Sequence, residues 1–289
     1  MVRLRAGLAN DRRWAIADTS GRLITGKRDA RVHRIRARYA PDLSWVEVSL
    51  SASPSVPLGV PRNVQPETGD STEPPDPDTT AQPRRESQSA AATPASQADA
   101  AAWERFALSA NNAALKQWLS EALHRPVELV ENPAAGFPDD ENFNGPTVIS
   151  TETLQAITEW FPDLSLDEVR RRFRANLEVA GAEVPFWEDR LYGPVGAVIP
   201  FRIGGVRFGG CNPCRRCVVP TRDSRSGRAD ADFIERFRQM RAATLPPWAE
   251  RSRFDHHYRL AVNTIVLDAG STGVIAVGDP VVLEPAVSP

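Results

Sequence analysis

The residues with the richest chemistry in this 289-residue chain are three cysteines, Cys211, Cys214 and Cys217, spaced three apart. A C-x-x-C-x-x-C run offers thiolates to zinc or to an iron–sulfur cluster, and both prefer four ligands. The sequence has no fourth cysteine, so His256 and His257 are the candidates to complete a zinc site. Three cysteines cannot build a disulfide framework, which points to metal or redox chemistry instead.

The neighbours of these cysteines separate their expected roles. Arg215 and Arg216 precede Cys217, and cationic neighbours favour the thiolate form of a cysteine. We therefore expect Cys217 to bind a metal or an anionic cofactor, whereas Cys211 better fits a buried structural thiol. Flanking glycines and a proline predict that residues 209–217 form a tight loop after a strand.

The charge is balanced in sign but not in residue type. Lys27 and Lys116 are the only lysines among 35 basic residues, and arginine is the better fork for phosphate and carboxylate groups. The formal net charge of −2 gives the whole chain no electrostatic reason to seek nucleic acid or an anionic membrane. Its apolar stretches are far shorter than the roughly 18 residues of a membrane span. Since Met1 is not followed by a secretory pattern, we expect a cytoplasmic protein.

Composition divides the chain into three parts. Residues 54–98 are rich in Pro, Ser, Ala, Thr and Gln and nearly lack large apolar side chains, so they cannot offset the entropy cost of folding. We expect a disordered insertion there. Residues 1–53 form a small β-rich piece that must pack on other parts of the chain, and residues 99–289 form the main domain.

Local patterns predict a mainly β fold with few helices. Apolar spacing and turn residues predict strands at 14–17, 23–25, 45–50, 127–130, 177–179, 195–201, 206–208, 260–267 and 274–283. Helical spacing predicts helices near 115–123, 151–161 and 232–241, and Ser165 with Glu168 forms a capping box for one more. Helices scattered among many short strands favour the α+β class with a β-barrel-like architecture.

Several segments, in a fixed order, carry a family resemblance. They are Asp11-Arg12-Arg13-Trp14 to Lys27-Arg28, Val148-Ile149-Ser150-Thr151, Arg172-Phe173-Arg174-Ala175-Asn176-Leu177, Pro185-Phe186-Trp187-Glu188-Asp189, Cys214-Arg215-Arg216-Cys217 with Thr221, Asp223 and Gly227, and Val277-Gly278-Asp279-Pro280-Val281. Together they resemble the MOSC superfamily, named for the C-terminal domain of molybdenum cofactor sulfurase, and within it proteins like the mitochondrial amidoxime-reducing component. The resemblance implies a MOSC β-barrel-like domain in the main part and a partial N-terminal β-barrel portion at 1–53.

The resemblance also implies a cofactor site. Cys217 would ligate the molybdenum of a pterin-based cofactor, because a thiolate suits a soft, heavy metal. The residues implied to hold the pterin and its phosphate are Arg12, Ser150, Thr151, Arg174, Asn176 and Arg216. The helix start behind Ser150 offers free N–H groups to a phosphate, although Ser150 would cap that helix in any case.

Acidic residues near these motifs have supporting roles in our interpretation. Arg174 offers a bidentate fork to phosphate or pterin, unless it pairs with Glu188 or Asp189 instead. Apart from that pairing, we interpret Glu188 and Asp189 as orienting residues. Asp223 is expected to shape the turn before Gly227 rather than to act as an acid.

The resemblance implies a molybdenum-dependent oxidoreductase that reduces N-hydroxylated or N-oxide small molecules by oxygen-atom transfer. The chain shows neither an iron–sulfur ferredoxin module nor a nucleotide-binding glycine pattern, so electrons would come from a separate reductase or ferredoxin-type protein. Two alternatives stay open: sulfur carriage or cofactor delivery by a Cys217 persulfide, and a non-catalytic zinc-binding protein. Pyridoxal phosphate is not expected, because neither lysine lies in a recognisable pyridoxal motif.

Overall fold

The structure, a computed structural model, describes residues 2–3, 8–51, 102–138, 142–143, 145–268 and 273–284. Contacts divide the chain into one unit made of Met1–Ala52 and Ala101–Pro289, and a second unit, Ser53–Ala100. The insertion predicted at 54–98 lies outside the described residues. All elements described below belong to the first unit.

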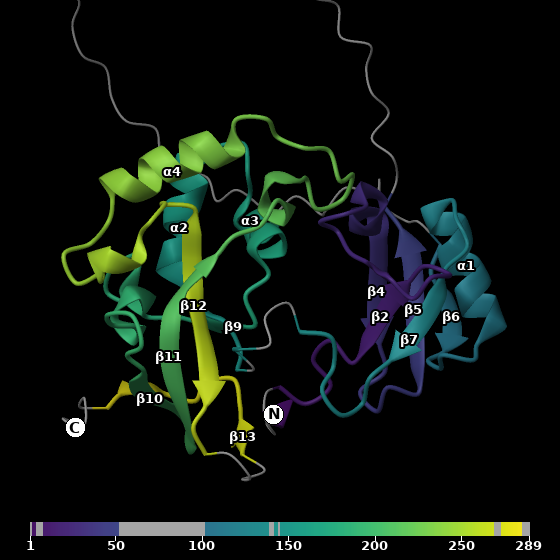
Figure 1. The fold of residues 1–289 in the computed structure, drawn as a ribbon, viewed down its shortest axis with the longest axis horizontal. Helices are drawn as coiled ribbons and strands as arrows, with labels where there is room; N and C mark the ends of the chain where they lie inside the picture. Colours follow the sequence, from purple (N-terminus) through teal and green to yellow (C-terminus); the bar gives the residue numbers. More distant parts are fainter. Residues whose placement is uncertain are drawn as a thin grey trace, which may run out of the picture. The chain divides into compact units, whose positions relative to one another are not determined.

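The N-terminal elements form two antiparallel sheets of three strands, with one helix beside them (Figure 1). The first sheet has the order β3 (Leu23–Ile24), β2 (Trp14–Ala17), β7 (Glu128–Glu131), and the second β4 (Ile35–Tyr39), β5 (Trp45–Leu50), β6 (Glu104–Ala107). The helix is α1 (Ala113–Leu123), and the 3-10 helix η1 (Ala30–Arg34) leads into β4. The predicted hairpin and the alternating strand are confirmed, since Val46 and Val48 both point into the core.

The domain boundary expected at residue 99 is wrong. β6 pairs with β5, and β7 pairs with β2, so residues from both sides of the insertion share the same sheets. Leu115 of α1 also packs in one core with Val46 of β5. The physical reason is that the first part alone is too small to bury its apolar face. We define the N-terminal lobe as residues 8–51 and 102–138.

The rest of the described chain is built around one six-stranded sheet in the order β14-β10-β11-β12-β8-β9. Its strands are β8 (Val148–Ser150), β9 (Leu177–Val179), β10 (Ile199–Ile203), β11 (Val206–Arg215), β12 (Arg259–Val266) and β14 (Val281–Leu283). A separate antiparallel pair joins β1 (Val2–Arg3) to β13 (Val274–Ile275). In the six-stranded sheet all neighbours are antiparallel except β8 and β9, which run parallel.

Three α-helices complete this part of the chain: α2 (Thr151–Trp160), α3 (Leu166–Phe173) and α4 (Phe233–Ala243). α2 and α3 form the crossover between the parallel strands β8 and β9, as a parallel pair requires. Figure 1 shows all three helices gathered toward one end of the long pair β11 and β12. The arrangement is the mainly β, barrel-like α+β fold that the sequence predicts.

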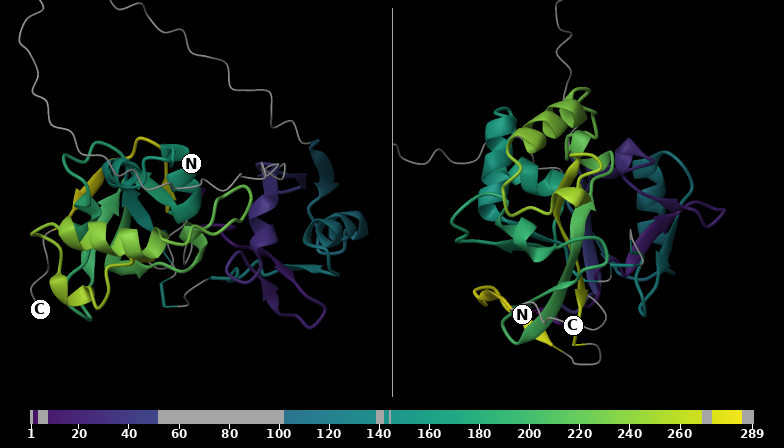
Figure 2. Two further views of the ribbon diagram at one scale, coloured as in Figure 1. Left: turned by 90° about the horizontal axis from the view of Figure 1, so that it is seen from above. Right: turned by 60° about the vertical axis from the view of Figure 1, so that its left-hand side comes forward.

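The cysteine segment is a strand, not the tight loop predicted for residues 209–217. β11 includes both Cys211 and Cys214. Its pairing with β12 contains two register shifts, which bend a strand, and Figure 2 shows the resulting curvature. Gly210 allows the backbone of Leu191 to approach this strand closely and does not form a turn. A Cβ atom at position 210 would lie 1.7 Å from the carbonyl oxygen of Leu191.

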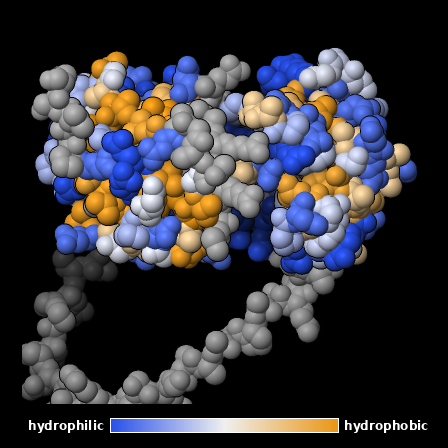
Figure 3. Space-filling model, turned by 90° about the horizontal axis from the view of Figure 1, so that it is seen from below, coloured by the Kyte–Doolittle hydropathy of each residue, from blue (hydrophilic) through white to orange (hydrophobic). Residues whose placement is uncertain are grey.

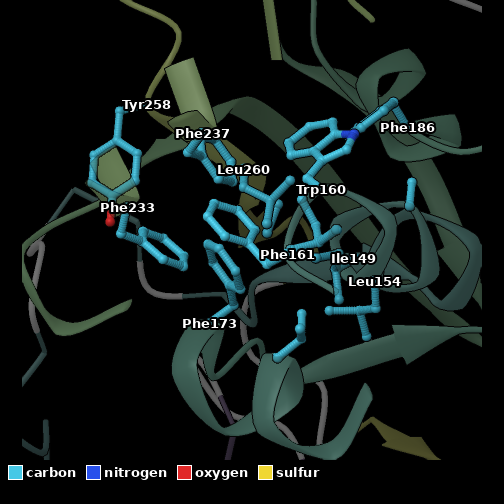
Figure 4. Packing of buried hydrophobic residues seen from close by; sticks show 14 residues of the cluster. Ile149, Leu154, Trp160, Phe161, Phe173, Phe186, Phe233, Phe237, Tyr258 and Leu260 are labelled. Atoms are coloured by element: carbon cyan, nitrogen blue, oxygen red, sulfur yellow. The ribbon is translucent and has the colours of Figure 1, made fainter. Parts of the chain in front are cut away.

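An aromatic core packs the helices against the sheet. Phe173 from α3 meets Phe233 and Phe237 from α4 near its centre (Figure 4). Phe161 and Phe233 stack with ring centroids 4.4 Å apart. Each fully buried phenylalanine contributes roughly 1.5–3 kcal/mol to stability. Phe173 is the last residue of α3, so its packing in this core anchors the start of the segment 174–176.

Three of the predicted helices begin at side chains that cap them. Asn112, Ser150 and Ser165 each accept a hydrogen bond from a backbone N–H of the first turn. The capping box at Ser165 is formed in one direction: the Glu168 N–H donates to the Ser165 hydroxyl. The Glu168 carboxylate instead accepts hydrogen bonds from the N–H and hydroxyl of Ser224, and so ties α3 to the loop that follows Cys217.

The surface carries scattered apolar residues. Val277 and Val195 are the most exposed of the large hydrophobic side chains among the described residues, and Figure 3 shows apolar patches interrupted by hydrophilic residues on one face. Single exposed valines are ordinary on protein surfaces. Among the described helices, none is both long and apolar enough to cross a bilayer.

Candidate functional site

Cys217 lies just beyond the end of β11 and ahead of the 3-10 helix η4 (Val219–Thr221). Its thiol is free and half-exposed. The Cys217 carbonyl oxygen accepts a hydrogen bond from the Tyr258 hydroxyl at 3.2 Å. The backbone N–H of Arg216 donates to the Tyr258 carbonyl oxygen at 3.1 Å. Both residues are therefore held against the segment that leads into β12.

The other two cysteines differ from each other. Cys211 is only 7% exposed, and burial raises the pKa of its thiol. This environment fits the structural role expected for Cys211. Cys214 is half-exposed, and its Sγ lies 3.4 Å from Nη1 of Arg216. Cys214 therefore shares a cationic neighbour with Cys217, whereas Cys211 lies inside the protein.

The alternative zinc site of three cysteines and a histidine is not assembled. Within the residues that the structure describes, no three Cys, His, Asp or Glu side chains gather as a metal ion would require. His256 Nδ1 accepts a hydrogen bond from the Tyr258 N–H, and His257 stacks on Phe254. Both histidines thus have local roles in packing.

Arg216 connects Cys217 to the end of α3. Its Nη2 donates to the carbonyl oxygen of Phe173, and its guanidinium lies 5.4 Å from the centroid of the Phe173 ring. Its Nε is buried and has no hydrogen-bond partner in the described part of the chain. An unpaired buried donor costs roughly 1–3 kcal/mol. The site therefore offers an unused N–H donor next to Cys217.

Arg174 follows α3 in the left-handed conformation, with φ at 52°. Its side chain is exposed and forms no ion pair with a carboxylate of the described residues. The alternative that it pairs with Glu188 or Asp189 is wrong, because both carboxylates are buried and bonded elsewhere. The guanidinium of Arg174 is therefore available to an anion.

Asn176 follows Arg174 by two residues and holds β9 beside β8. Its Oδ1 accepts hydrogen bonds from the N–H and the hydroxyl of Thr147, at 3.0 and 2.9 Å. The Asn176 N–H donates in turn to the Thr147 hydroxyl at 3.1 Å. The amide oxygen is thus engaged, so Asn176 can offer a ligand only the N–H groups of its Nδ2.

The hydroxyls of Ser150 and Thr151 are already engaged in the structure. Ser150 is fully buried; its Oγ accepts the Thr153 N–H that caps α2 and lies 2.8 Å from Oε2 of Glu188. The Thr151 hydroxyl donates to Glu178 at 2.8 Å. Their assignment to a cofactor stays a prediction.

Glu188 and Asp189 belong to a buried polar network on the 3-10 helix η3 (Trp187–Leu191). Burial, with a further contribution from the Asp189 charge, raises the pKa of Glu188 to about 7. Asp189 pairs with the fully buried Arg241 at 2.5 Å. Glu188 joins η3 to the start of α2 through Ser150 and Thr153, and Asp189 joins η3 to α4 through Arg241. These contacts agree with the interpretation of both acids as orienting residues.

Two contacts place Arg12 in the N-terminal lobe. Its Nε lies 3.7 Å from a carboxylate oxygen of Asp11, and its carbonyl oxygen accepts the Phe137 N–H at 2.9 Å. Arg12 has the left-handed conformation, with φ at 50°. Its role toward a cofactor stays a prediction.

Asp223 shapes its turn as expected. Its carboxylate accepts hydrogen bonds from the N–H and hydroxyl of Ser226, and its carbonyl oxygen accepts the Gly227 N–H. Gly227 has φ at 74°, a conformation that glycine adopts without strain.

Sequence reasoning missed two residues that hold the site, Tyr258 and Thr147. Their partners Cys217 and Asn176 lie 41 and 29 positions away in the sequence. A tyrosine or threonine in an apolar strand region has no local pattern that would reveal so distant a partner.

A family model of the MOSC domain matches residues 146–282, a span that starts just before β8 and ends in β14. No curated protein matches the chain. The matched span contains the six-stranded sheet from its β9 edge to β14, all three cysteines, Arg174 and Asn176. The closer likeness to the amidoxime-reducing component stays a prediction. Residues 146–282 of this chain are a MOSC domain.

Proposed function

We propose that the MOSC domain binds a molybdenum–pterin cofactor through Cys217 and reduces N-hydroxylated or N-oxide small molecules with it. The observation that carries the proposal is the half-exposed thiol of Cys217. Tyr258 holds the backbone of Cys217 in place through a hydrogen bond to its carbonyl oxygen, and Arg216 is the preceding residue in the chain. The family match supports the same class of cofactor, because MOSC domains are associated with it.

The residues around Cys217 fit an anionic, thiolate-bound group. Thiolate is the soft donor that such a metal prefers. Arg216 contributes a buried Nε without a described partner, and Arg174 contributes a guanidinium that is not paired with a carboxylate of the described chain. Asn176 can donate from its amide nitrogen to the acceptor atoms of a pterin edge.

The bound group would supply two-electron oxygen-atom transfer. The chain's own residues bind and orient: Cys217 is the metal ligand, Arg174 and Arg216 neutralise anionic groups, and Asn176 donates to the pterin. Over the whole reaction, an N-hydroxylated substrate loses its oxygen as water, which consumes two electrons and two protons. A separate reductase or ferredoxin-type protein supplies the electrons.

A second candidate is sulfur carriage or cofactor delivery by a persulfide on Cys217. The observation in its favour is Cys214, a second half-exposed thiol three residues before Cys217, whose sulfur lies 3.4 Å from Nη1 of Arg216. Persulfide chemistry needs an accessible thiol of this kind.

Elemental analysis of the purified chain, produced in cells that make the cofactor, tests the proposal. We expect about one molybdenum per chain in the wild type and none in Cys217→Ser, because the thiolate ligand that the protein supplies is lost. Cys211→Ser is the matched control and should retain molybdenum, since Cys211 is buried away from the site.

Equal loss of molybdenum in both variants would contradict the assignment of Cys217 as the ligand. A wild-type chain without molybdenum but with labile sulfane sulfur would favour the persulfide function. Zinc in place of molybdenum would overturn both candidates.

A further inference from the structure

Basic residues from two parts of the first unit lie in one region near α3. His33 and Arg36 come from the N-terminal lobe, whereas Arg174 and Arg222 come from the MOSC domain. Burial, followed by the charges of Arg222, Arg174 and Arg36, lowers the pKa of His33. Three guanidinium groups therefore lie close enough to oppose a charge on this imidazole.

Direct contacts bring the two segments together. Nη2 of Arg36 donates to the carbonyl oxygen of Ser224 at 2.8 Å. A Cβ atom on Gly227 would lie 2.3 Å from the carbonyl oxygen of Ala30, so the backbone around Gly227 lies directly against the start of η1. The loop after Arg222 and the segment from Ala30 to Arg36 are therefore in direct contact.

The positive charge in this region is not balanced by the carboxylates that face it. Glu168 and Asp223 are the acids near Arg36, and Arg171 and Arg225 add positive charge on the same side. Glu168 is already bonded to Arg172 and Ser224, and Asp223 to its own turn.

His33 Nε2 lies 3.2 Å from the carbonyl oxygen of Gly26, and the two arginines beside it have donors that no carboxylate of the described residues takes up. Arg36 and Arg222 donate to carbonyl oxygens of Ser224 and Gly227 rather than to carboxylates. Nε of Arg222 is buried without a hydrogen-bond partner among the described residues. Half-buried like charges and unused donors are costly unless an anion joins them.

We infer that His33, Arg36, Arg174 and Arg222 form a binding site for a phosphate-class dianion. Guanidinium forks match the geometry of phosphate oxygens and remain charged at every physiological pH. The inference rests on the proposed function in one respect: the dianion can be the phosphate of the pterin cofactor. A separate phosphorylated small molecule has the same chemistry.

Phosphate binding to the full chain, produced without the cofactor, tests the site. Inorganic phosphate is titrated against chloride at equal ionic strength, and the melting temperature and the pKa of His33 are followed, the latter by its imidazole NMR signal. The four histidines of the chain are distinguished by a His33→Gln variant. We expect a saturable rise in melting temperature and an upward shift of the His33 pKa, since a neighbouring anion favours the protonated ring.

Arg174→Gln is the decisive variant, because its exposed side chain can change without disturbing the core. Loss of a charge-assisted phosphate contact should weaken phosphate binding about tenfold or more. Arg105→Gln is the matched control: this exposed arginine is paired with Glu47 on the N-terminal lobe and should leave phosphate binding unchanged.

Phosphate binding that is equal in Arg174→Gln and the wild type overturns the site, and so does a wild-type response to phosphate no larger than that to chloride. Cofactor-loaded protein distinguishes the sources: phosphate has no further effect if the cofactor fills the site, and still binds if a separate ligand does. Arg174-dependent phosphate binding in a chain that never retains molybdenum would support the site and refute the proposed function. Molybdenum retention in a chain that does not bind phosphate would refute the phosphate site and leave the proposed function in place.

Discussion

Replacing Glu188 with glutamine is expected to remove a pH dependence of folding stability that the wild-type chain carries. Glu188 is 1% exposed, and its Oε2 accepts hydrogen bonds from the hydroxyls of Ser150 and Thr153. Its Oε1 is buried without a partner among the described residues. Glutamine has the same shape, stays uncharged at every pH, and keeps an oxygen that can accept from both hydroxyls.

The sign and size follow from the raised pKa of Glu188. Burial and then the charge of Asp189 raise it from 4.5 to about 7, so between these values the folded chain holds a proton that the unfolded chain has released. This contribution to stability is complete below the unfolded pKa and is lost as pH rises through about 7. A difference of this size corresponds to about 3 kcal/mol, which is an upper bound.

Urea unfolding of both proteins across this pH range measures the effect. The free energy of unfolding of Glu188→Gln, relative to the wild type, should rise by about 2–3 kcal/mol between pH 5 and pH 8. The lowered pKa values of His33 and His256 affect both proteins and cancel in the comparison. Parallel curves for the two proteins would show that Glu188 is ionised inside the fold and refute the reasoning.

Two further substitutions test the packing around the site. Gly210→Ala would place a methyl group against the Leu191 carbonyl oxygen and should lower the free energy of unfolding in urea by about 3 kcal/mol or more. The control is Gly205→Ala, which has no atom within 4 Å of the new Cβ and should change this free energy by less than about 0.5 kcal/mol. Equal effects of the two substitutions would contradict the close approach of Gly210 to Leu191. Arg241→Met leaves Asp189 buried without its counter-ion and should cost about 3–5 kcal/mol, and adding Asp189→Asn should recover part of that loss in the melting temperature.

The elements that could be predicted from sequence are those set by local signals. Ser150 and Ser165 cap helices with their own first turns, and Val46 and Val48 alternate within one strand, so neighbouring residues determine the outcome. The same holds for Asp223, whose hydrogen bonds stay within its own turn.

The errors come from contacts between distant residues. Gly210 looks like a turn residue until the backbone of Leu191 is placed against it. The boundary at residue 99 failed because β7 pairs with β2, a choice made by burial of shared apolar faces rather than by composition. The alternative in which Arg174 pairs with Asp189 is wrong for a similar reason, because Arg241 on α4 pairs with that carboxylate.

The antiparallel pairing of β5 with β6 has a consequence for the evolution of the chain. Val48 is the register partner of Glu104, so the strand that enters the segment between them and the strand that leaves it are adjacent, roughly 5 Å apart. A two-residue hairpin could connect such neighbours. The segment between Leu50 and Glu104 therefore connects two neighbouring strands of one sheet, and a change in its length leaves the strand order β4-β5-β6 as it is.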